Sequence, residues 1–168
     1  RIDATLEKIA GVTLKNEYQY SDTSIIEGVK LNGSQILTYD WDDLTRMTSR
    51  TLKLTAPFTT QYTYLKGSNA GGETMLVAGL KNGGETLSYT YDQFGNITSV
   101  SKNGTVVESY EYDGLNQLVK VTNGANVTEY AYDAGGNLTS VKLNGEVQDT
   151  YGYTDAGWKD LLTSFNGQ

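Results

Sequence analysis

Tyrosine recurs in this sequence in a fixed pattern that leaves few folds open. All 13 tyrosines lie in Tyr-x-Tyr pairs or, once, in a Tyr-x-Trp pair, and successive pairs begin 21, 23, 27, 21, 20 and 21 residues apart. Self-similarity at such a period indicates a repeat architecture, in which each unit packs on its neighbours. The pairs begin at Tyr18, Tyr39, Tyr62, Tyr89, Tyr110, Tyr130 and Tyr151.

Turn residues punctuate the units twice. Six of the seven units carry an Asn-Gly step, which favours a type I′ hairpin turn because both residues accept positive φ. A second turn, Asp-x-x-Gly or Asp-x-x-Asn, follows the aromatic pair, and its Asp can bond its own backbone two residues on. Each unit therefore reads as strand, Asp turn, strand and Asn-Gly turn. The Asn-Gly steps begin at Asn32, Asn82, Asn103, Asn123, Asn144 and Asn166.

These signals predict an all-β fold, an antiparallel meander of β-hairpins that forms a curved sheet. Tyr, Thr and Val suit a pleated surface, whereas Leu, Ile, Val and Phe together supply only 37 of 168 residues, which makes a conventional core thin. Residues i and i+2 of a strand share a face, so each aromatic pair sends both rings to one side. The alternation along the strands is incomplete. Either both faces are partly covered, or β-bulges shift the register.

The chain divides unevenly in sequence. Residues 1–17 precede the first aromatic pair and combine weak helical spacing over Thr5–Ala10 with a strand-like run after Gly11. We predict that they are the degraded end of an earlier repeat, and that residues 18–168 form one continuous domain of about seven repeats. Residues 65–79 are expected to form a Gly-rich surface loop followed by a strand. The start at Arg1 indicates a piece of a longer protein.

Composition excludes several kinds of chemistry. The chain has no His and no Cys, which removes Ser-His-Asp and Cys-His nucleophiles and zinc sites built on these ligands. A net charge of −7 and a pI near 4.5 speak against nucleic acid and anionic membranes as partners. No apolar run approaches the length of a membrane span. We therefore expect no enzyme activity, no cofactor and no metal.

Two sets of repeated residues could carry function. The aspartates after each pair could hold a metal or act as acid and base, but they recur one per unit along a sheet edge, which favours turn capping. The tyrosines could stack on sugars, yet their repeat-equivalent positions favour structural packing. Both sets are therefore assigned to the framework of the fold.

The pattern Tyr-x-Tyr-Asp-x-x-Gly-Asn/Arg-Leu/Ile-x-x-Val resembles the YD repeat of Rhs (rearrangement hot spot) proteins. This repeat also occurs in bacterial wall-associated proteins, in the B and C components of insecticidal toxin complexes, and in teneurins. The resemblance covers the chain from Tyr18 onward and weakens at Tyr62 and Tyr151. The structural repeat residues that carry it are Tyr89, Tyr91, Asp92, Gly95, Tyr110, Tyr112, Asp113, Tyr130, Tyr132, Asp133 and Gly136.

The resemblance implies a β-strand ribbon that spirals into a hollow β-shell. It implies a non-enzymatic structural segment of a bacterial surface or toxin protein, which encloses or presents a C-terminal effector. Its partners would be the rest of its parent chain, namely further repeats and a C-terminal toxin, and its location extracellular or at the cell surface. The alternative is a surface adhesion module that binds glycans or a partner protein. Exposed sheet edges would also permit edge-to-edge oligomers.

Overall fold

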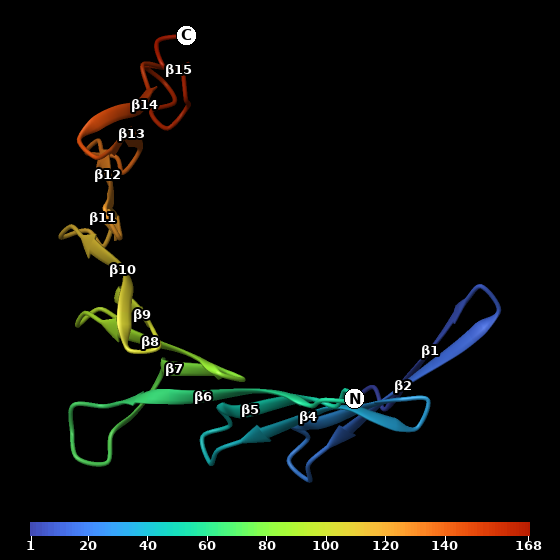
Figure 1. Ribbon diagram of the computed structural model, residues 1–168. Helices are drawn as coiled ribbons and strands as arrows, with labels where there is room; N and C mark the ends of the chain where they lie inside the picture. Colours follow the sequence, from blue (N-terminus) through green and yellow to red (C-terminus); the bar gives the residue numbers. More distant parts are fainter. The chain divides into compact units, whose positions relative to one another are not determined.

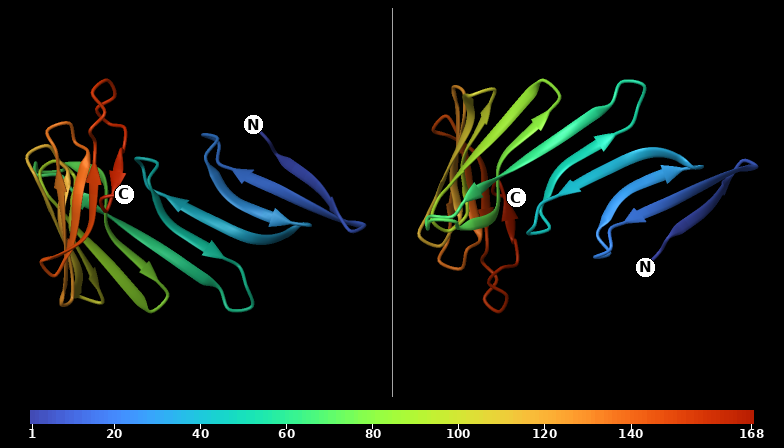
Figure 2. Two further views of the ribbon diagram at one scale, coloured as in Figure 1. Left: turned by 90° about the horizontal axis from the view of Figure 1, so that it is seen from above. Right: turned by 90° about the horizontal axis from the view of Figure 1, so that it is seen from below.

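The protein consists of fifteen β-strands and no helix in a computed structural model that describes residues 1–168 (Figure 1). The strands follow one another in the sheet in chain order, and turns or short loops join them at alternating ends (Figure 2). The predicted all-β antiparallel meander is confirmed. The strands are β1 (Ala4–Ile9), β2 (Val12–Tyr20), β3 (Ile26–Leu31), β4 (Ser34–Trp41), β5 (Met47–Leu52), β6 (Phe58–Lys66), β7 (Glu73–Asn82), β8 (Glu85–Tyr91), β9 (Ile97–Lys102), β10 (Thr105–Tyr112), β11 (Leu118–Asn123), β12 (Asn126–Tyr132), β13 (Leu138–Leu143), β14 (Glu146–Gly152) and β15 (Ser164–Phe165).

Two units make up the chain, residues 1–87 and residues 88–168, with the boundary inside β8. Residues 1–17 form β1 and the first part of β2, which pair from Ala4 opposite Glu17 to Ile9 opposite Val12. The residues with weak helical spacing form a strand and not a helix, because an isolated helix of about one and a half turns is unstable. The glycine-rich loop occupies residues 67–72, and the strand β7 follows it, as predicted.

The Asn-Gly steps form two kinds of turn. Four of the six place both residues at positive φ, as type I′ requires. The expectation of the same turn at Asn82 and Asn123 is wrong, because each of these asparagines is the last residue of a strand. Only Gly83 and Gly124 have positive φ there, at 56° and 59°. This is the type II′ pattern, which needs glycine only at its first central position.

A β-bulge recurs beside the second aromatic residue of the pairs. Glu111 lies opposite Lys120, but Tyr112 lies opposite Leu118, so Val119 is an extra residue in β11. The same shift occurs next to Tyr20, Trp41 and Tyr132. The extra residue of a bulge shifts the alternation by one position, so the side chains after it point to the opposite face from the one that strict alternation would give. The bulges therefore account for the incomplete alternation of the sequence.

A second bulge explains the length of the repeats. The hairpins that lead to Tyr39, Tyr110 and Tyr151 have type I′ turns and one bulged residue in the strand that carries the aromatic pair. The hairpin that leads to Tyr130 has a type II′ turn and no bulge. Its unit is 20 residues long, whereas the other three are 21. The bulge thus absorbs the extra residue and keeps the aromatic pair on one face.

The corrected registers divide the sheet into two faces, and the same division holds in each unit. In the second unit the Tyr face carries Tyr110, Tyr112, Leu118, Val121, Tyr130, Tyr132, Leu138 and Val141. The polar face carries Ser109, Glu111, Lys120, Thr122, Glu129, Ala131, Ser140 and Lys142. The aromatic pairs and most aliphatic residues therefore lie on one face, together with Glu108 and Thr128. Most hydroxyl and charged residues lie on the other, together with Val127 and Ala131.

No hydrophobic side chain of the chain is buried. The only buried side chains are those of Arg46 and Thr60, at 8% and 2% exposure, and all 13 tyrosines are half-buried. A hydrophobic core needs two packed layers, whereas each unit has one. Backbone ladders and cross-strand pairs hold each unit together, and its Tyr face has no cover of its own.

Candidate functional site

Five copies of one five-residue turn follow the aromatic strands. In each, the first N–H donates to the fifth carbonyl and the fourth N–H donates to the first carbonyl. At Asp133, the carboxylate Oδ1 also accepts from the N–H groups of Gly135 (2.8 Å) and Asn137 (2.9 Å). The equivalent carboxylates make the same two contacts, so each is occupied by its own turn. The turns begin at Ser21, Asp42, Asp92, Asp113 and Asp133.

The fourth residue of each turn has positive φ, which an L-residue rarely adopts. Gly95 and Gly136 occupy this position at 88° and 86°, where the missing Cβ removes the strain. In the Asp113 turn it is Asn116, at 61°, and not Gly114 that takes the left-handed conformation. Asn96 Nδ2 also donates to Asn116 Oδ1 at 3.0 Å, which links two successive turns.

The second aromatic residue of a pair ties its strand to the preceding one. The Tyr112 hydroxyl donates to the Ile97 carbonyl at 3.0 Å, and the Tyr132 hydroxyl donates to the Leu118 carbonyl at 2.8 Å. Trp41 does the same through its indole N–H, which explains how it replaces a tyrosine. Tyr20 and Tyr64 make the equivalent contacts with Ile2 and Met47. Tyr91 holds the same place in β8.

The first aromatic residue of a pair packs across the strands. Tyr110 lies opposite Val121 and Tyr130 lies opposite Val141, on the Tyr face, and Tyr89 holds the same place in β8. Such aromatic and β-branched pairs stabilise antiparallel sheets. The structural repeat residues are thus not brought together in one pocket, because each set serves its own repeat.

Removing the Tyr132 hydroxyl is expected to destabilise the second unit by about 0.5–1.5 kcal/mol, because the Leu118 carbonyl loses its donor. Urea unfolding of the Tyr132→Phe variant measures this loss. Tyr130→Phe is the matched control, since the Tyr130 hydroxyl makes no hydrogen bond in the structure. Equal losses in the two variants would show that the hydroxyl contact does not stabilise the repeat.

Tyr110 has a pKa well above that of an ordinary tyrosine. Its hydroxyl donates to Glu108 Oε2, and this bond, together with partial burial, raises the pKa of Tyr110 to about 12. The folded protein holds this proton more tightly than the unfolded chain, whose tyrosine has the ordinary pKa of 10.0. The associated stabilisation is complete below pH 10 and is lost as the pH rises toward 12.

We therefore expect Tyr110 to ionise about two pH units above the ordinary tyrosine pKa in an absorbance titration of the folded protein. The Glu108→Gln variant should bring this tyrosine back toward the ordinary pKa, because the carboxylate that repels the phenolate is gone. Stability measured across the same alkaline range should fall less steeply in the variant. An unchanged titration in Glu108→Gln would contradict the assignment.

Arg46 forms a clasp that the sequence does not predict. Its Nε donates to Asp42 Oδ2 at 2.7 Å, its Nη2 donates to Glu73 Oε2 at 2.9 Å, and its Nη1 donates to the Thr74 carbonyl. The guanidinium also stacks on the Tyr64 ring, 4.4 Å from the centroid. Lys66 and then Arg46 hold the pKa of the Glu73 carboxyl below its ordinary value. The clasp therefore joins the turn after β4 to the start of β7.

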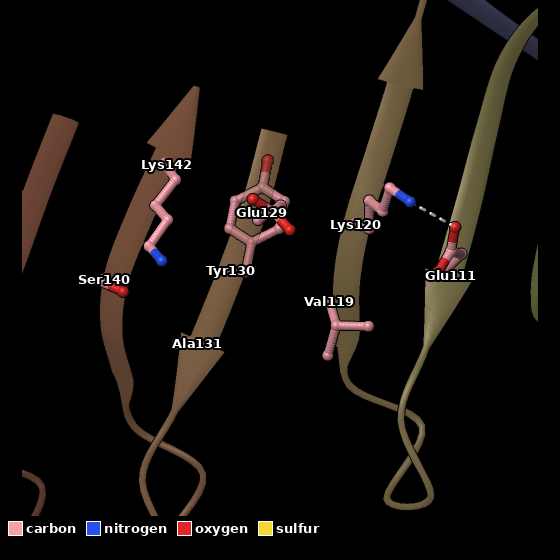
Figure 3. A pocket seen from close by; sticks show the side chains of 8 residues that line it. All are labelled: Glu111, Val119, Lys120, Glu129, Tyr130, Ala131, Ser140 and Lys142. Carbon is pink, nitrogen blue, oxygen red and sulfur yellow. Dashed lines mark hydrogen bonds and ion pairs between the residues drawn. The ribbon is translucent and has the colours of Figure 1, made fainter. Parts of the chain in front are cut away.

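The polar face has two hollows at equivalent positions of two repeats. The first, of about 370 Å³, lies over β10–β13 (Figure 3). Figure 3 shows Lys120 turned toward Glu111, with which it forms an ion pair at 2.9 Å, while Lys142 has no such contact. The second hollow, of about 350 Å³, is lined by Thr48, Gln61, Tyr62, Thr63, Gly79, Leu80, Lys81 and Thr86.

No group of three or more carboxylates lies where it could hold a metal ion. None of the chain's secondary structure is a helix that could span a membrane.

The chain matches a family model described as RHS Repeat over residues 112–147. No curated protein sequence matches it significantly. Among solved structures, TcdB2-TccC3 without its hypervariable C-terminal region is 16% identical over 87% of this chain and 10% of the other, with a TM-score of 0.51. TcdB2-TccC3-Cdc42 matches over the same shares at 16% identity, with a TM-score of 0.49. A Photorhabdus luminescens Tc holotoxin pore is 16% identical over 83% and 10%, with a TM-score of 0.47.

The likeness to TcdB2-TccC3 at a TM-score of 0.51 shows a shared fold, and the chain spans about a tenth of the length of that protein. The matched segment runs from Tyr112 to Val147 and includes the Asp113 and Asp133 turns and the Tyr132 contact. The same turns and contacts recur in the first unit, at Asp42 and Tyr64. Residues 112–147 therefore match the RHS repeat, and equivalent strand–turn units recur in the rest of the chain.

Proposed function

We propose that the chain is a non-catalytic structural segment of a larger RHS/YD-repeat protein, in which its sheet forms part of the wall of a β-shell. The observation that carries the proposal is a two-faced sheet without a buried hydrophobic side chain. The rings and aliphatic side chains of the Tyr face are only half-buried, and an apolar face without cover is typical of an interaction site. The Tyr face is therefore the inner side, covered by other parts of the same protein, and the polar face is the outer side.

The occupant of the inner side would be the rest of the parent chain, namely further repeats and a C-terminal effector. The shared fold with TcdB2-TccC3 supports this assignment, since that protein is about ten times longer and its structure was solved without a hypervariable C-terminal region. Catalysis has no part in the proposal, because the repeated carboxylates are engaged in separate turns and form no convergent acid–base pair.

Photo-crosslinking in a protein that carries this chain with its flanking sequence tests the proposal. Benzoylphenylalanine replaces Tyr130 on the Tyr face in one variant and Glu129 on the polar face in the matched control. We expect the Tyr130 position to crosslink to the C-terminal region and the Glu129 position to give no such product. Equal crosslinking from both positions, or none from Tyr130, would overturn the proposal.

The alternative function, a surface adhesion module, draws on different residues. Phe94, Leu115 and Trp158 are 68%, 74% and 63% exposed, in or near the turns that follow the aromatic strands. Exposed aromatic rings can stack on glycans or on a partner protein. Glycan-array binding that is lost in Trp158→Ala would favour this function, and silent arrays would count against it. Both functions place the protein outside the bacterial cell or on its surface.

A further inference from the structure

The middle residue of each aromatic pair lies on the polar face and meets a residue of the following strand. In three repeats a contact between side chains fills this position. Asp40 accepts a hydrogen bond from Ser49, Glu111 pairs with Lys120 at 2.9 Å, and the hydroxyl groups of Thr90 and Ser99 lie 2.6 Å apart. In two repeats no contact between side chains fills this position, and these are the two hollows, at Gly79 and at Ser140. At Gly79 the Thr63 hydroxyl donates to the Gly79 carbonyl at 3.4 Å.

The two hollows differ in charge. Around Ser140, Lys120 and Lys142 are balanced by Glu111 and Glu129, so the lining is neutral. Around Gly79 the lining contains Lys81 and no carboxylate, because Gln61 stands opposite Lys81 where Glu129 stands opposite Lys142. Lys81 has no ion-pair partner. The hollow at Gly79 is therefore a cationic site in a chain of net charge −7.

Glycine keeps this hollow open. A Cβ at Gly79 would lie 2.8 Å from Thr63 Oγ1 and 3.4 Å from the Leu87 carbonyl, so a side chain there would crowd the floor. Gly28 is the equivalent glycine of another repeat, and there the side chain of Gln35 covers the position. A Cβ built on Gly28 would lie 2.5 Å from Gln35 Nε2. The Gly79 hollow thus has a glycine floor and no glutamine cover.

We propose that the hollow at Gly79 binds a carboxylate group, with Lys81 Nζ and Gln61 Nε2 as its donors. The Thr63 hydroxyl, which donates to the Gly79 carbonyl at 3.4 Å, can rotate to become a third donor. Two equivalent repeats supply the reason, because Asp40 and Glu111 place a carboxylate at the position that Thr63 occupies in this repeat. A volume of about 350 Å³ suits a small carboxylate or an acidic side chain. This site does not rest on the proposed shell.

Amide chemical shifts of the full chain, followed by NMR at constant ionic strength, test the site. Sodium acetate and a blocked Glu-Glu dipeptide are titrated separately, with sodium chloride as the reference. We expect saturable shifts at Thr63, Gly79 and Lys81 with the carboxylates and none with chloride. Tighter binding of the dipeptide assigns the site to a polypeptide partner, and equal binding assigns it to free carboxylates. The absence of saturation, or equal shifts with chloride, would overturn the proposal.

Three variants test whether binding depends on the hollow itself or only on the charge of the chain. Lys81→Gln should weaken binding by about tenfold or more, because it removes the only cation. Thr63→Glu should abolish binding by filling the hollow from within, as Glu111 does in its own repeat. Lys53→Gln, an exposed lysine outside both hollows, should leave binding unchanged. Unchanged binding in Lys81→Gln would contradict the site even where the crosslinking test of the shell succeeds.

Discussion

Replacing Arg46 with methionine is expected to lower the melting temperature of the chain by roughly 10 °C. The guanidinium is one of only two buried polar side chains, and it satisfies two carboxylates and one carbonyl at once. Without it, Asp42 and Glu73 face each other with no buried cation between them, and Tyr64 loses its stacking partner. Thermal unfolding followed by circular dichroism measures the shift.

Two further variants show whether the loss comes from the clasp. Arg46→Lys should recover little of the stability, since an ammonium cannot bind several acceptors with the planar fork of arginine. Arg50→Met removes an exposed arginine that has no ion pair and should change the melting temperature little. Amide exchange near the start of β7 should accelerate only in the Arg46 variants. An equal loss in Arg50→Met would mean that the clasp is not what stabilises the first unit.

The Asp133→Ala substitution is expected to lower the melting temperature by roughly 5 °C. It removes the acceptor of two backbone N–H groups, at Gly135 and Asn137, and of the Asn137 side chain. Asp133→Asn keeps one oxygen for the two backbone donors and should cost clearly less. A loss in Asp133→Asn as large as in Asp133→Ala would show that the charge, and not the hydrogen bonds, stabilises the turn.

Acid provides an independent measurement of the same turn. The Asn137 side chain and then its backbone N–H hold the pKa of Asp133 below the ordinary value of 3.8. The stabilisation is therefore present above pH 3.8 and is lost as the pH falls through the lowered pKa. Acid unfolding of Asp133→Ala should lack this component. An acid profile identical to that of the native chain would contradict it.

The repeat and its strands are predictable from the sequence because their signals are local. The tyrosine pairs and the turn residues each act within a few neighbours. Turn type at Asn123 is not predictable in this way. The two loop residues could be Asn123 and Gly124 or Gly124 and Ala125, and the register between β11 and β12 decides between them. The bulge at Val119 likewise depends on the pairing of β10 with β11.

The clasp and the hollows cannot be predicted from the sequence, because they depend on contacts between distant residues. Arg46 meets Glu73 and Thr74 across 27 and 28 residues, in a repeat whose length is irregular. The only sequence signal is an arginine at the fifth position of a turn whose first residue is Asp42. The hollow at Gly79 results from what is missing at Thr63, a carboxylate that other repeats have. That Gly79 lies opposite Thr63 depends on the pairing of β6 with β7, which the sequence does not give.

The bulge in the aromatic strand has a consequence for how arrays of this kind can diversify. In most β-sheets a one-residue insertion turns the rest of the strand over and exposes its apolar side. Here the unit that ends at Tyr130 is one residue shorter than its neighbours, yet its rings keep their side, because a hairpin either carries the bulge or omits it. Copies of unequal length can therefore be joined by recombination without a compensating mutation elsewhere.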